Sequence, residues 1–335
     1  MEQVTTHRIV VSKRGGPEVL EVIDEVPAKP EAGEVRVRVA TAGVSAFDLM
    51  VRSRSFPGFP KVPFTPGCDI VGVVDELGEA VTSVKTAQMV AAGPFPNGGY
   101  TESICLPASD LVPIPPGIDP AAAVCLVANY TTAHVMLHEV AKVEPGQSIL
   151  VQGAAGGVGT ATLDLGRLAG LEMYGTASPK NHELVAGFGA TPIDYRNENV
   201  AERVRSLTGG GVDAVFDPIG GARQLWRSYR TLRKGGRLVW FGVAAIKSKG
   251  IWVIPTSLAT RLFLSLLPDG KHAPLTPDLE KIDHKPRLAE LLDQLAAGKL
   301  QPVVAERIPL REAGRAHALL ERGGHAGRVV LVNDQ

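Results

Sequence analysis

The clearest sign of chemistry in the sequence is a glycine-rich stretch, Gly-Ala-Ala-Gly-Gly-Val-Gly, at residues 153–159. It follows an apolar run at residues 148–152 and precedes a predicted helix at residues 160–169. Glycine permits a tight turn and lets the backbone approach a pyrophosphate, and the start of a helix offers unpaired N–H groups. Because the stretch lies between a strand and a helix, it predicts a dinucleotide-binding turn rather than an ordinary loop.

The residues after the second predicted strand, at residues 172–176, distinguish NAD(H) from NADP(H). Sites that prefer NAD(H) place Asp or Glu there, about 20 residues beyond the glycines, to hold the ribose 2′-hydroxyl. Here Ser178 and Lys180 follow the strand, without an acidic residue. A carboxylate would repel a 2′-phosphate, whereas a hydroxyl and an ammonium group would bind one, so we expect NADPH as cofactor. The alternative for Lys180 is a solvated lysine at a helix start.

His134 and His138 are four residues apart in a predicted helix at residues 121–140, a spacing that could direct both rings toward one metal ion. The spacing identifies no carboxylate or third ligand beside them, so a structural histidine pair is favoured and no metal is expected. Cys68 could be a reactive thiol, but a buried apolar cysteine is the favoured interpretation.

Two different patterns of elements must position these residues. The first 120 residues are rich in Pro and Gly and contain short alternating runs at residues 9–11, 35–39 and 70–74. Such runs are typical of strands joined by tight turns, and they predict a mostly antiparallel β domain. The first 13 residues are expected to contribute its first strand.

From residue 147 onward, predicted strands and helices alternate. Further strands are predicted at residues 172–176, 191–194, 213–217 and 237–242. This rhythm indicates βαβ units and a parallel sheet with right-handed crossovers. The chain ends with a predicted helix at residues 287–297 and a predicted strand at residues 328–332, and this tail is expected to return to the first domain.

Composition excludes several classes of protein. The 335 residues carry 35 basic and 35 acidic side chains, so no net charge draws the chain to nucleic acid or anionic lipid. No run of about 20 apolar residues is apparent, and residues 251–267, which come nearest, contain polar interruptions. The chain start lacks the apolar core of a signal peptide, and three cysteines without a CxxC pair suit a reducing compartment. We therefore expect a soluble, cytoplasmic protein that spans no membrane and binds no nucleic acid.

Several further strings are similar to one known family. They are Gly-Val-Ser-Ala-Phe-Asp at residues 43–48, Pro-Phe-Thr-Pro-Gly-Cys-Asp-Ile-Val-Gly at residues 63–72, Gly-Gly-Tyr-Thr-Glu at residues 98–102, and the segments 133–141 and 174–178. Together with the glycine-rich turn, they resemble the zinc-independent medium-chain dehydrogenases/reductases, specifically the quinone oxidoreductase (zeta-crystallin-like) branch. Within that branch the resemblance is greatest to the vesicle amine transport protein homologues.

The resemblance implies an α/β architecture of two domains. A GroES-like, mostly antiparallel β domain would bind the substrate and comprise residues 1–121 and 281–335. A Rossmann domain with a doubly wound parallel sheet would bind NADPH and comprise residues 122–280. A homodimer is also implied, and an edge strand near residues 271–276 could pair the two Rossmann sheets.

The resemblance also assigns cofactor contacts to individual residues. The pyrophosphate contacts correspond to Ala155, Gly156, Gly157 and Val158. The 2′-phosphate positions correspond to Lys180 and Tyr195, although a tyrosine packed at a strand end is the alternative for Tyr195. The segment beside the nicotinamide corresponds to Phe241, Gly242 and Val243. Thr132 and Ser178 complete the expected cofactor-binding set.

Zinc alcohol dehydrogenases of the same superfamily hold their catalytic zinc with Cys, His and Cys. The matching positions here are Ser45, Cys68 and Ala128. One thiol cannot form the three-ligand site that activates an alcohol, and residues 90–102 lack the cysteines of a structural zinc lobe. The resemblance therefore implies chemistry without zinc.

Four residues are expected to contribute to catalysis: Ser45, Asp48, Met50 and Tyr130. Asp48 would organise the nicotinamide pocket as a carboxylate at a helix start, and a simple N-cap is the alternative. Ser45 and Met50 replace the Asn and Tyr of many relatives, and Met50 cannot donate a proton. Tyr130 is an alternative proton donor unless it only packs in the core, and water could also supply the proton.

Without a metal or a flavin motif, the nicotinamide must deliver the reducing equivalents as hydride. Quinones and α,β-unsaturated carbonyls suit such a site because their developing negative charge is delocalised. We therefore expect an NADPH-dependent reductase of a small lipophilic quinone or enone. The apolar segment 250–267 could form a wall for such an acceptor, and the alternatives are that it packs at a dimer edge or only against other helices. The alternatives are a non-catalytic NADPH-binding protein, which Ser45 and Met50 favour, a reductase of one defined enone in a pathway, and a zinc-requiring alcohol dehydrogenase.

Overall fold

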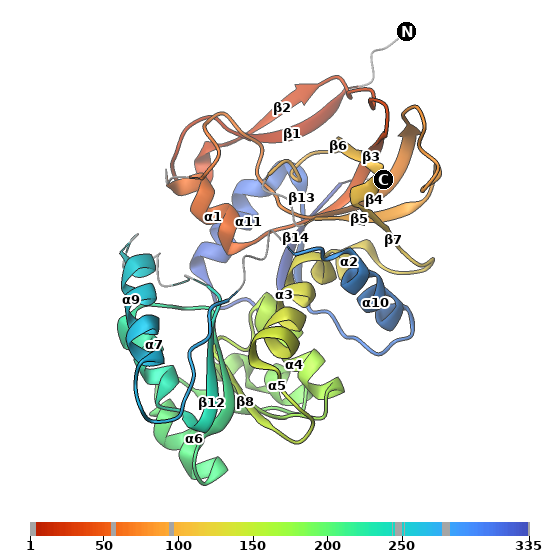
Figure 1. The fold of residues 1–335 in the computed structure, drawn as a ribbon. Helices are drawn as coiled ribbons and strands as arrows, with labels where there is room; N and C mark the ends of the chain where they lie inside the picture. Colours follow the sequence, from red (N-terminus) through yellow and green to blue (C-terminus); the bar gives the residue numbers. More distant parts are fainter. Residues whose placement is uncertain are drawn as a thin grey trace. The chain divides into compact units, whose positions relative to one another are not determined.

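A computed structural model describes residues 5–54, 58–93, 97–242, 244, 250, 252–276 and 282–333 (Figure 1). The chain forms two compact units, Met1–Thr131 together with Glu280–Gln335, and Thr132–Leu279. The first unit continues to Thr131, whereas the sequence analysis places a domain boundary at residue 121. The reason for the longer unit is that α2 (Pro120–Cys125) packs against β3 (Glu34–Gly43) and β4 (Ile70–Leu77) of that unit.

A mixed sheet forms the centre of the first unit. Its strand order is β13 (Val304–Pro309), β14 (Arg328–Val332), β3, β4, β5 (Met89–Ala92) and β7 (Leu111–Pro113), and β6 (Ser103–Pro107) also pairs with β3. β13 and β14 are parallel, and the other pairs are antiparallel. A separate antiparallel pair joins β1 (Thr6–Val11) to β2 (Leu20–Glu25). The predicted antiparallel character and the return of the C-terminal tail to this unit are both confirmed.

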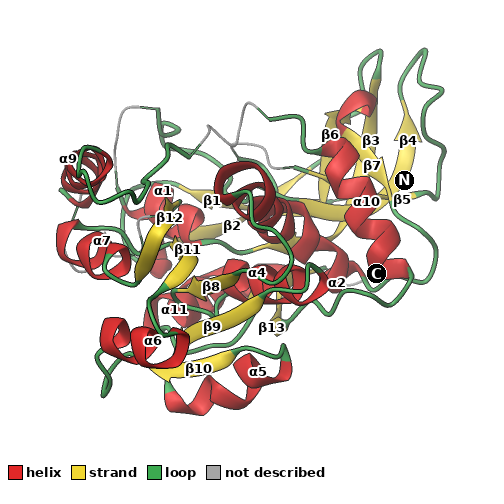
Figure 2. Ribbon diagram, turned by 60° about the horizontal axis from the view of Figure 1, so that its bottom comes forward, coloured by secondary structure: helices red, strands yellow, loops and turns green. Residues whose placement is uncertain are grey.

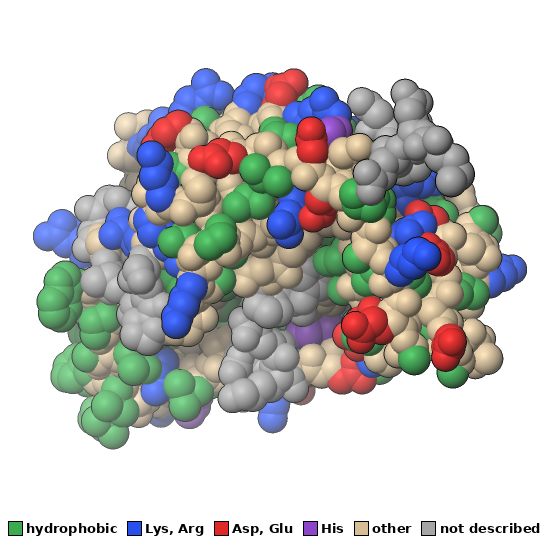
Figure 3. Space-filling view, turned by 90° about the horizontal axis from the view of Figure 1, so that it is seen from above, with side chains coloured by type: hydrophobic (Ala, Val, Ile, Leu, Met, Phe, Trp, Pro, Cys, Tyr) green, Lys and Arg blue, Asp and Glu red, His purple; other side chains and the backbone are tan. Residues whose placement is uncertain are grey.

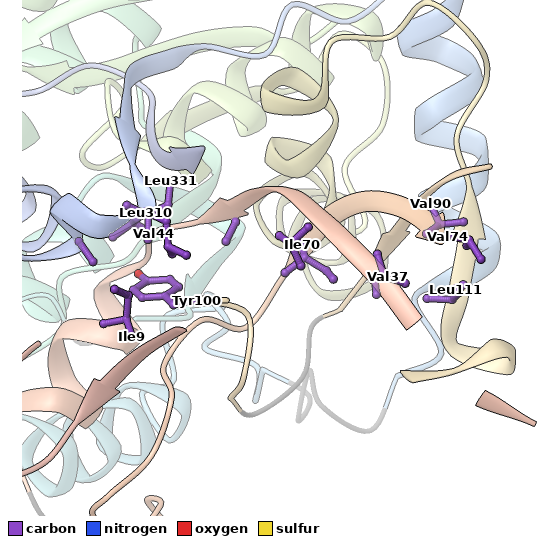
Figure 4. Packing of buried hydrophobic residues seen from close by; sticks show 14 of the residues in the cluster. Ile9, Val37, Val44, Ile70, Val74, Val90, Tyr100, Leu111, Leu310 and Leu331 are labelled. Carbon is purple, nitrogen blue, oxygen red and sulfur yellow. The ribbon is translucent and has the colours of Figure 1, made fainter. Parts of the chain in front are cut away.

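Alternating side chains of these strands make the core of the first unit (Figure 4). Val35, Val37 and Val39 are at most 1% exposed, whereas the arginines between them are not buried. This period of two is what a strand with one face on a core requires. Ile70 from β4 and Tyr100 from the segment before β6 pack in the same cluster.

Short helices flank this sheet. They are α1 (Ala46–Ser53), α10 (Lys285–Ala296) and α11 (Ala313–Arg322), with 3₁₀ turns at Pro17–Val19, Ala108–Asp110 and Leu310–Glu312. α11 contacts α1 and also packs against β13 and β14. The helix predicted near the C-terminus, at residues 287–297, is therefore confirmed as α10, with a slightly earlier start.

The long helix at residues 120–141 is less regular than the sequence predicts. The predicted helix at residues 121–140 is observed as Pro120–Ala141, and it contains two π-helical segments, Leu126–Tyr130 and Val135–Ala141, on either side of α3 (Thr131–His134). By length and composition it is apolar enough to cross a membrane, a property that the sequence analysis missed. However, 72% of its most apolar window is buried inside the protein, which is the behaviour of a core helix.

The second unit contains a fully parallel sheet with the strand order β10-β9-β8-β11-β12 (Figure 2). The strands are β8 (Ser148–Val151), β9 (Glu172–Ala177), β10 (Thr191–Asp194), β11 (Val212–Asp217) and β12 (Leu232–Trp240). All four residues of β8 are buried, as expected for a central strand covered on both faces. The order reverses between β8 and β11, so the doubly wound sheet predicted from the sequence is confirmed and its switch point lies beside the glycine-rich turn.

Helices connect these parallel strands. They are α4 (Gly157–Leu168), α5 (His182–Gly187), α6 (Val200–Thr208) and α7 (Ala222–Tyr229), with a 3₁₀ turn at Pro179–Asn181, and α9 (Val253–Ser265) follows the last strand. Two sequence-based boundaries need correction: α4 begins three residues earlier than predicted, inside the glycine stretch, and β12 begins at Leu232 rather than at residue 237. The edge strand expected near residues 271–276 is reduced to one parallel bridge between Arg237 and His272.

Candidate functional site

The glycine-rich turn leaves the end of β8 as the spacing predicts. Gly153 has φ +65°, a left-handed conformation that favours glycine. A side chain at Gly159 would place its Cβ 2.4 Å from the Gly153 carbonyl oxygen, so only glycine lets α4 start this close to the turn. These two glycines therefore set the path of the backbone from strand to helix.

The start of α4 provides a suitable place for an anionic group. Gly156 is the N-cap and supplies no side-chain hydrogen bond to the helix. The first N–H groups of a helix have no partner within it, and here Gly157 and Val158 are partly exposed, whereas Ala155 is buried. Because a Cβ at Gly156 would meet only the Gly153 oxygen at 3.4 Å, the space beside the turn is open. This geometry fits the expected pyrophosphate.

A series of hydrogen-bonded, buried side chains supports the glycine-rich turn. The Gly153 amide donates to Thr176 Oγ1 at 3.0 Å, and Thr176 Oγ1 donates to Gln152 Oε1 at 2.9 Å. Gln152 Nε2 donates to Ser228 Oγ at 3.2 Å, and Ser228 Oγ donates to Asp217 Oδ2 at 2.6 Å. The sequence analysis missed this series. Polar residues at the carboxyl ends of the apolar strands β8, β9 and β11 were the available signal.

The corner expected to bind the 2′-phosphate lies at the ends of β9 and β10. Their register pairs Ala177 with Asp194, so Ser178 and Tyr195 follow neighbouring strand ends. Ser178 is buried, Lys180 is exposed, and the Tyr195 residue is 50% exposed. The structure thus brings the chain segments of these expected residues together at one edge of the sheet.

The acidic residue of this corner is turned away into its own loop. Asp194 Oδ1 accepts the Arg196 amide at 3.0 Å, and its Oδ2 accepts Asn197 Nδ2 at 2.6 Å. The backbone hydrogen bond from Arg196 is the main cause that lowers the pKa of Asp194. This carboxylate therefore closes a turn after β10 and does not occupy the position, after β9, from which an acid would hold a ribose hydroxyl.

The segment expected beside the nicotinamide follows β12 and crosses the loop after β11. The Phe241 amide donates to the Asp217 carbonyl oxygen at 3.2 Å, and a Cβ at Gly242 would lie 2.5 Å from the Pro218 oxygen. Glycine is therefore required for the close approach of these two loops. Val243 lies outside the described residues, and Thr132 is partly exposed on α3.

In the first unit, Ser45 and Asp48 form a reciprocal pair at the start of α1. Ser45 is the N-cap, so the interpretation of Asp48 as an N-cap is wrong: Asp48 is the third helical residue of a capping box. Ser45 Oγ and Ser45 N donate to Asp48 Oδ2 at 2.6 and 2.8 Å, and the Gly67 amide donates to Asp48 Oδ1 at 3.0 Å. Burial raises the pKa of Asp48 to about 6, although these hydrogen bonds oppose the shift.

A second buried charge lies close to this pair. Asp69 is fully buried, and its Oδ1 accepts Arg328 Nη2 at 2.7 Å, while Arg328 Nη1 donates to the Val124 carbonyl oxygen at 3.0 Å. The neighbouring Cys68 is partly exposed and donates to Asp69 Oδ1 at 3.7 Å, so it is not the buried apolar cysteine favoured from the sequence. Desolvation of its thiol nevertheless raises the pKa well above its usual range, and the carboxylate of Asp69 adds to the shift. A thiol that resists ionisation is a poor nucleophile.

The remaining expected catalytic residues lie on two helices. Met50 is partly exposed on α1, whereas Tyr130 is only 2% exposed on the long central helix. His134 and His138 of that helix lie ring to ring, with centroids 4.6 Å apart. Among the described residues, no group of three or more His, Cys, Asp or Glu side chains is arranged to hold a metal ion.

Sequence reasoning also missed a buried polar network that fixes the other end of α1. Arg52 Nη1 bonds to His317 Nδ1 at 3.0 Å, and His317 Nε2 bonds to the Tyr100 hydroxyl at 3.1 Å. Arg52 also pairs with Glu321. Burial, together with the adjacent Arg52 charge, lowers the pKa of His317 to about 3, so this histidine is neutral at physiological pH.

Two family descriptions match the chain. The description "Alcohol dehydrogenase GroES-like domain" matches residues 31–116, and "Zinc-binding dehydrogenase" matches residues 188–331. Among curated proteins, the quinone oxidoreductase of Pseudomonas aeruginosa is 33% identical over 97% of this chain and 99% of its own length. The zebrafish synaptic vesicle membrane protein VAT-1 homolog is 30% identical over 91% of this chain, which spans only 65% of that longer protein.

Solved structures agree with these relationships. Escherichia coli quinone oxidoreductase complexed with NADPH is 27% identical and has a TM-score of 0.86, covering 98% of this chain and 100% of its own. An NAD-dependent alcohol dehydrogenase is also 27% identical, with a TM-score of 0.82 and coverage of 97% and 99%. Because neighbours with different cofactors share this fold, the fold does not select the cofactor, and the site residues must be considered individually.

The name of the second family description raises the question of zinc. The positions that match zinc ligands are Ser45, Cys68 and Ala128, which offer one thiol, one hydroxyl and no third donor. This donor set does not fit a catalytic zinc ion, which needs three Cys, His or carboxylate ligands and an open position. No catalytic step is therefore derived through zinc.

The GroES-like match, the doubly wound parallel sheet, and the full-length similarity to a bacterial quinone oxidoreductase all lead to one assignment. They confirm the predicted family and fold. The chain belongs to the medium-chain dehydrogenase/reductase family, in the group that contains the quinone oxidoreductases and the VAT-1 homologs.

Proposed function

We propose that this protein is an NADPH-dependent, zinc-independent reductase that transfers hydride to quinones or activated α,β-unsaturated carbonyls. The observation that supports this proposal most is the corner at the ends of β9 and β10, where Lys180 and Tyr195 are exposed and the carboxylate of Asp194 closes its own turn. Such a corner favours a 2′-phosphate over a free 2′-hydroxyl. The NADPH complex of the similar E. coli quinone oxidoreductase supports the same choice.

In this proposal the second unit holds the cofactor through three contact groups. The α4 start at Ala155–Val158 would bind the pyrophosphate, and Ser178, Lys180 and Tyr195 would bind the adenosine ribose and its 2′-phosphate. Thr132, Phe241, Gly242 and Val243 would lie toward the nicotinamide. Bound NADPH would supply a hydride from its nicotinamide ring. The buried chain through Thr176 and Gln152 would keep the turn in place while the cofactor enters and leaves.

The first unit would organise the acceptor side through Ser45 and Asp48. At neutral pH the Asp48 carboxylate is mainly ionised, because its pKa is about 6. The carboxylate then accepts a hydrogen bond from the Ser45 hydroxyl and holds that hydroxyl in one orientation. We assign Asp48 a positioning role, and propose Ser45 as the polar group beside the acceptor. Tyr130, Met50 and water remain the other proposed contributors, and Met50 can only pack.

The proposed acceptors follow from the absence of a three-ligand zinc set at Ser45, Cys68 and Ala128. A Lewis acid assists an alcohol in losing its proton, whereas a quinone or enone spreads the developing negative charge over its own π system.

We further propose that the protein acts as a homodimer. In α9, Val253 and Leu264 are buried, whereas Leu262 and Phe263 are exposed, as are the capping residues Trp252 and Leu266. Hydrophobic side chains gather at the left of Figure 3, the side on which Figure 1 draws α9. Within the described part of the segment beside β12, His272 makes one bridge, with Arg237, and Leu275 is exposed. A short edge segment next to an apolar helix is suited to a second copy of the chain. Sedimentation velocity should give a dimer that Leu266→Asp weakens.

The direct test follows absorbance at 340 nm with NADPH and, separately, NADH. The acceptors are an ortho-quinone, a para-quinone and a simple enone, each measured with and without a chelator. We expect rapid oxidation of NADPH that the chelator does not affect. Loss of turnover with the chelator would contradict zinc-independence, and a preference for NADH would contradict the cofactor assignment.

A non-catalytic NADPH-binding protein is the second candidate function. The sequence observation that favours it is Met50, which has no proton to donate where many relatives carry tyrosine. Tight NADPH binding without turnover of any acceptor in the panel would favour this candidate. Turnover of a single enone with no quinone activity would instead indicate a pathway-specific reductase.

A further inference from the structure

Arg196, which the sequence analysis did not single out, lies against Tyr195 immediately after β10. Its guanidinium carbon is 5.6 Å from the centroid of the Tyr195 ring, a cation–π arrangement. Its Nε donates to the Tyr195 hydroxyl oxygen at 3.4 Å. Because the oxygen accepts this bond, the hydroxyl can donate its own proton to an anion. Arg196 therefore places a positive charge within one hydrogen bond of the atom expected to face the 2′-phosphate.

The two carboxylates closest in sequence to Arg196 accept hydrogen bonds from other groups, although the Asp194 charge, after the hydrogen bond with Tyr195, also helps to raise the pKa of Arg196. Asp194 accepts the Arg196 amide and the Asn197 side chain. Glu198 accepts the Asp194 amide at 2.8 Å through Oε1 and pairs with Arg203 at 3.2 Å through Oε2. Both acids are thus committed to the turn after β10 and to the start of α6. The basic side chains Lys180 and Arg196 follow the neighbouring strand ends and are both exposed.

We propose that Arg196 is a specificity-determining residue that binds the 2′-phosphate together with Lys180 and Tyr195. This inference rests on the proposed NADPH-dependent function. Since Nε is bonded to Tyr195, the two Nη groups would face the phosphate oxygens. A guanidinium offers its N–H groups in a planar fork that matches phosphate, whereas the Lys180 ammonium acts as a point charge. Stacking on Tyr195 holds the fork in place before the ligand arrives, which reduces the entropy lost on binding.

The test uses the full chain and ligands that separate this corner from the rest of the site. Isothermal titration calorimetry would measure the dissociation constants of 2′,5′-ADP, 5′-ADP and inorganic phosphate. The variants are Arg196→Gln, Arg196→Lys, Lys180→Gln and Tyr195→Phe. Lys234→Gln is the charge-loss control. Lys234 is exposed near the amino end of β12, whereas Lys180 and Arg196 follow the carboxyl ends of their strands.

We expect Arg196→Gln to weaken 2′,5′-ADP binding by about tenfold, as the loss of one charge-assisted phosphate contact should. 5′-ADP binding should change by less than about twofold, since it lacks the 2′-phosphate. Arg196→Lys should lose part of the affinity, because it keeps the charge but loses the fork. Tyr195→Phe and Arg196→Gln should couple when combined, because each supports the other.

Several outcomes would overturn the inference. If Arg196→Gln weakens both nucleotides equally, the residue only maintains the loop. If only Lys180→Gln affects 2′,5′-ADP, the phosphate is held without Arg196, and the NADPH assignment stands. If inorganic phosphate binds the wild-type protein as tightly as 2′,5′-ADP, the corner binds free phosphate, and Arg196 does not determine nucleotide specificity. If the wild type does not prefer 2′,5′-ADP to 5′-ADP, the proposed cofactor fails as well.

Discussion

The glycine turn of the parallel sheet and the α1 region of the β unit use polar groups in opposite ways. At the turn, the groups offered to a ligand are partly exposed backbone amides, and the buried side chains Gln152, Thr176 and Asp217 only support them. Around α1, the ionisable side chains Asp48 and Arg52 are themselves buried. The turn can therefore receive a charged ligand with little rearrangement. The buried ionisable side chains around α1 instead form an electrostatic framework, by which we mean Asp48, Arg52, Asp69, His317 and Arg328.

The largest effect should come from breaking that framework. Arg328→Met would leave Asp69 buried without its partner, and we expect a loss of about 3–5 kcal/mol in the free energy of unfolding. Arg307→Met is a matched control, because Arg307 forms an exposed ion pair with Asp119 in the same unit. The control should lose less than about 1 kcal/mol. Urea denaturation followed by circular dichroism measures both, and equal losses would contradict the contrast between buried and exposed pairs.

Acid titration should separate two members of the framework by the sign of their effects. The pKa of Asp48 is about 6 in the folded protein, so its stabilising contribution is present below its unfolded value of 3.8 and is lost as pH rises toward 6. The pKa of His317 is about 3, so its contribution is present above its unfolded value of 6.5 and is lost as pH falls. Between pH 4 and 6, each group changes the free energy of unfolding by about 1.4 kcal/mol per pH unit, or roughly 3 kcal/mol over the whole range. The contribution of Asp48 decreases as pH rises, and that of His317 increases.

Two variants measure these signs. Relative to wild type, Asp48→Asn should make stability fall more steeply on acidification from pH 6 to 4, and His317→Gln should make it fall less steeply. Urea midpoints at three pH values in this window give both slopes. Curves that run parallel to the wild type for both variants would mean that neither group titrates differently in the folded protein.

A smaller effect is expected from the support beneath the glycine turn. Thr176→Val keeps the shape of the side chain but leaves the Gly153 amide and Gln152 Oε1 without their partner, at a cost of about 1–3 kcal/mol. NADPH binding should weaken in parallel, because the turn loses its anchor. Thr162→Val is the control: its hydroxyl donates only to the helix carbonyl of Val158. If both variants bind NADPH equally, the buried chain does not position the turn.

The smallest effect concerns the exposed corner. Lys180→Ala should raise the apparent KM for NADPH by about tenfold, because one charge-assisted contact is lost, and should change that for NADH by less than about twofold. Stability should stay within about 0.5 kcal/mol of wild type, as expected for an exposed side chain away from caps and cores. Steady-state kinetics with both cofactors measures the difference. Equal changes for NADPH and NADH would refute the 2′-phosphate assignment.

Much of the fold could be predicted because its elements depend on local patterns. Alternation in residues 35–39 follows from one buried face of a strand, and the continuous apolar run at 148–152 follows from a strand covered on both faces. Glycine is favoured at residue 153 by its left-handed φ of +65°, and at residue 159 because a Cβ there would lie 2.4 Å from the Gly153 oxygen. The boundary of the first unit was harder to predict, because α2 joins it through packing against distant strands rather than through any local signal.

The sequence by itself determined the two architectures, the glycine-rich turn between β8 and α4, and the lack of an acid after β9. Each of these depends on residue type at short spacing, where backbone geometry leaves few choices. Only the tertiary structure decided that Ser45 rather than Asp48 caps α1, that Arg328 meets Asp69 across 259 residues, and that Arg52 meets His317 across 265. Such partners are selected by the cost of burying an unpaired charge, which is a property of the packed interior and leaves no periodic mark in the chain.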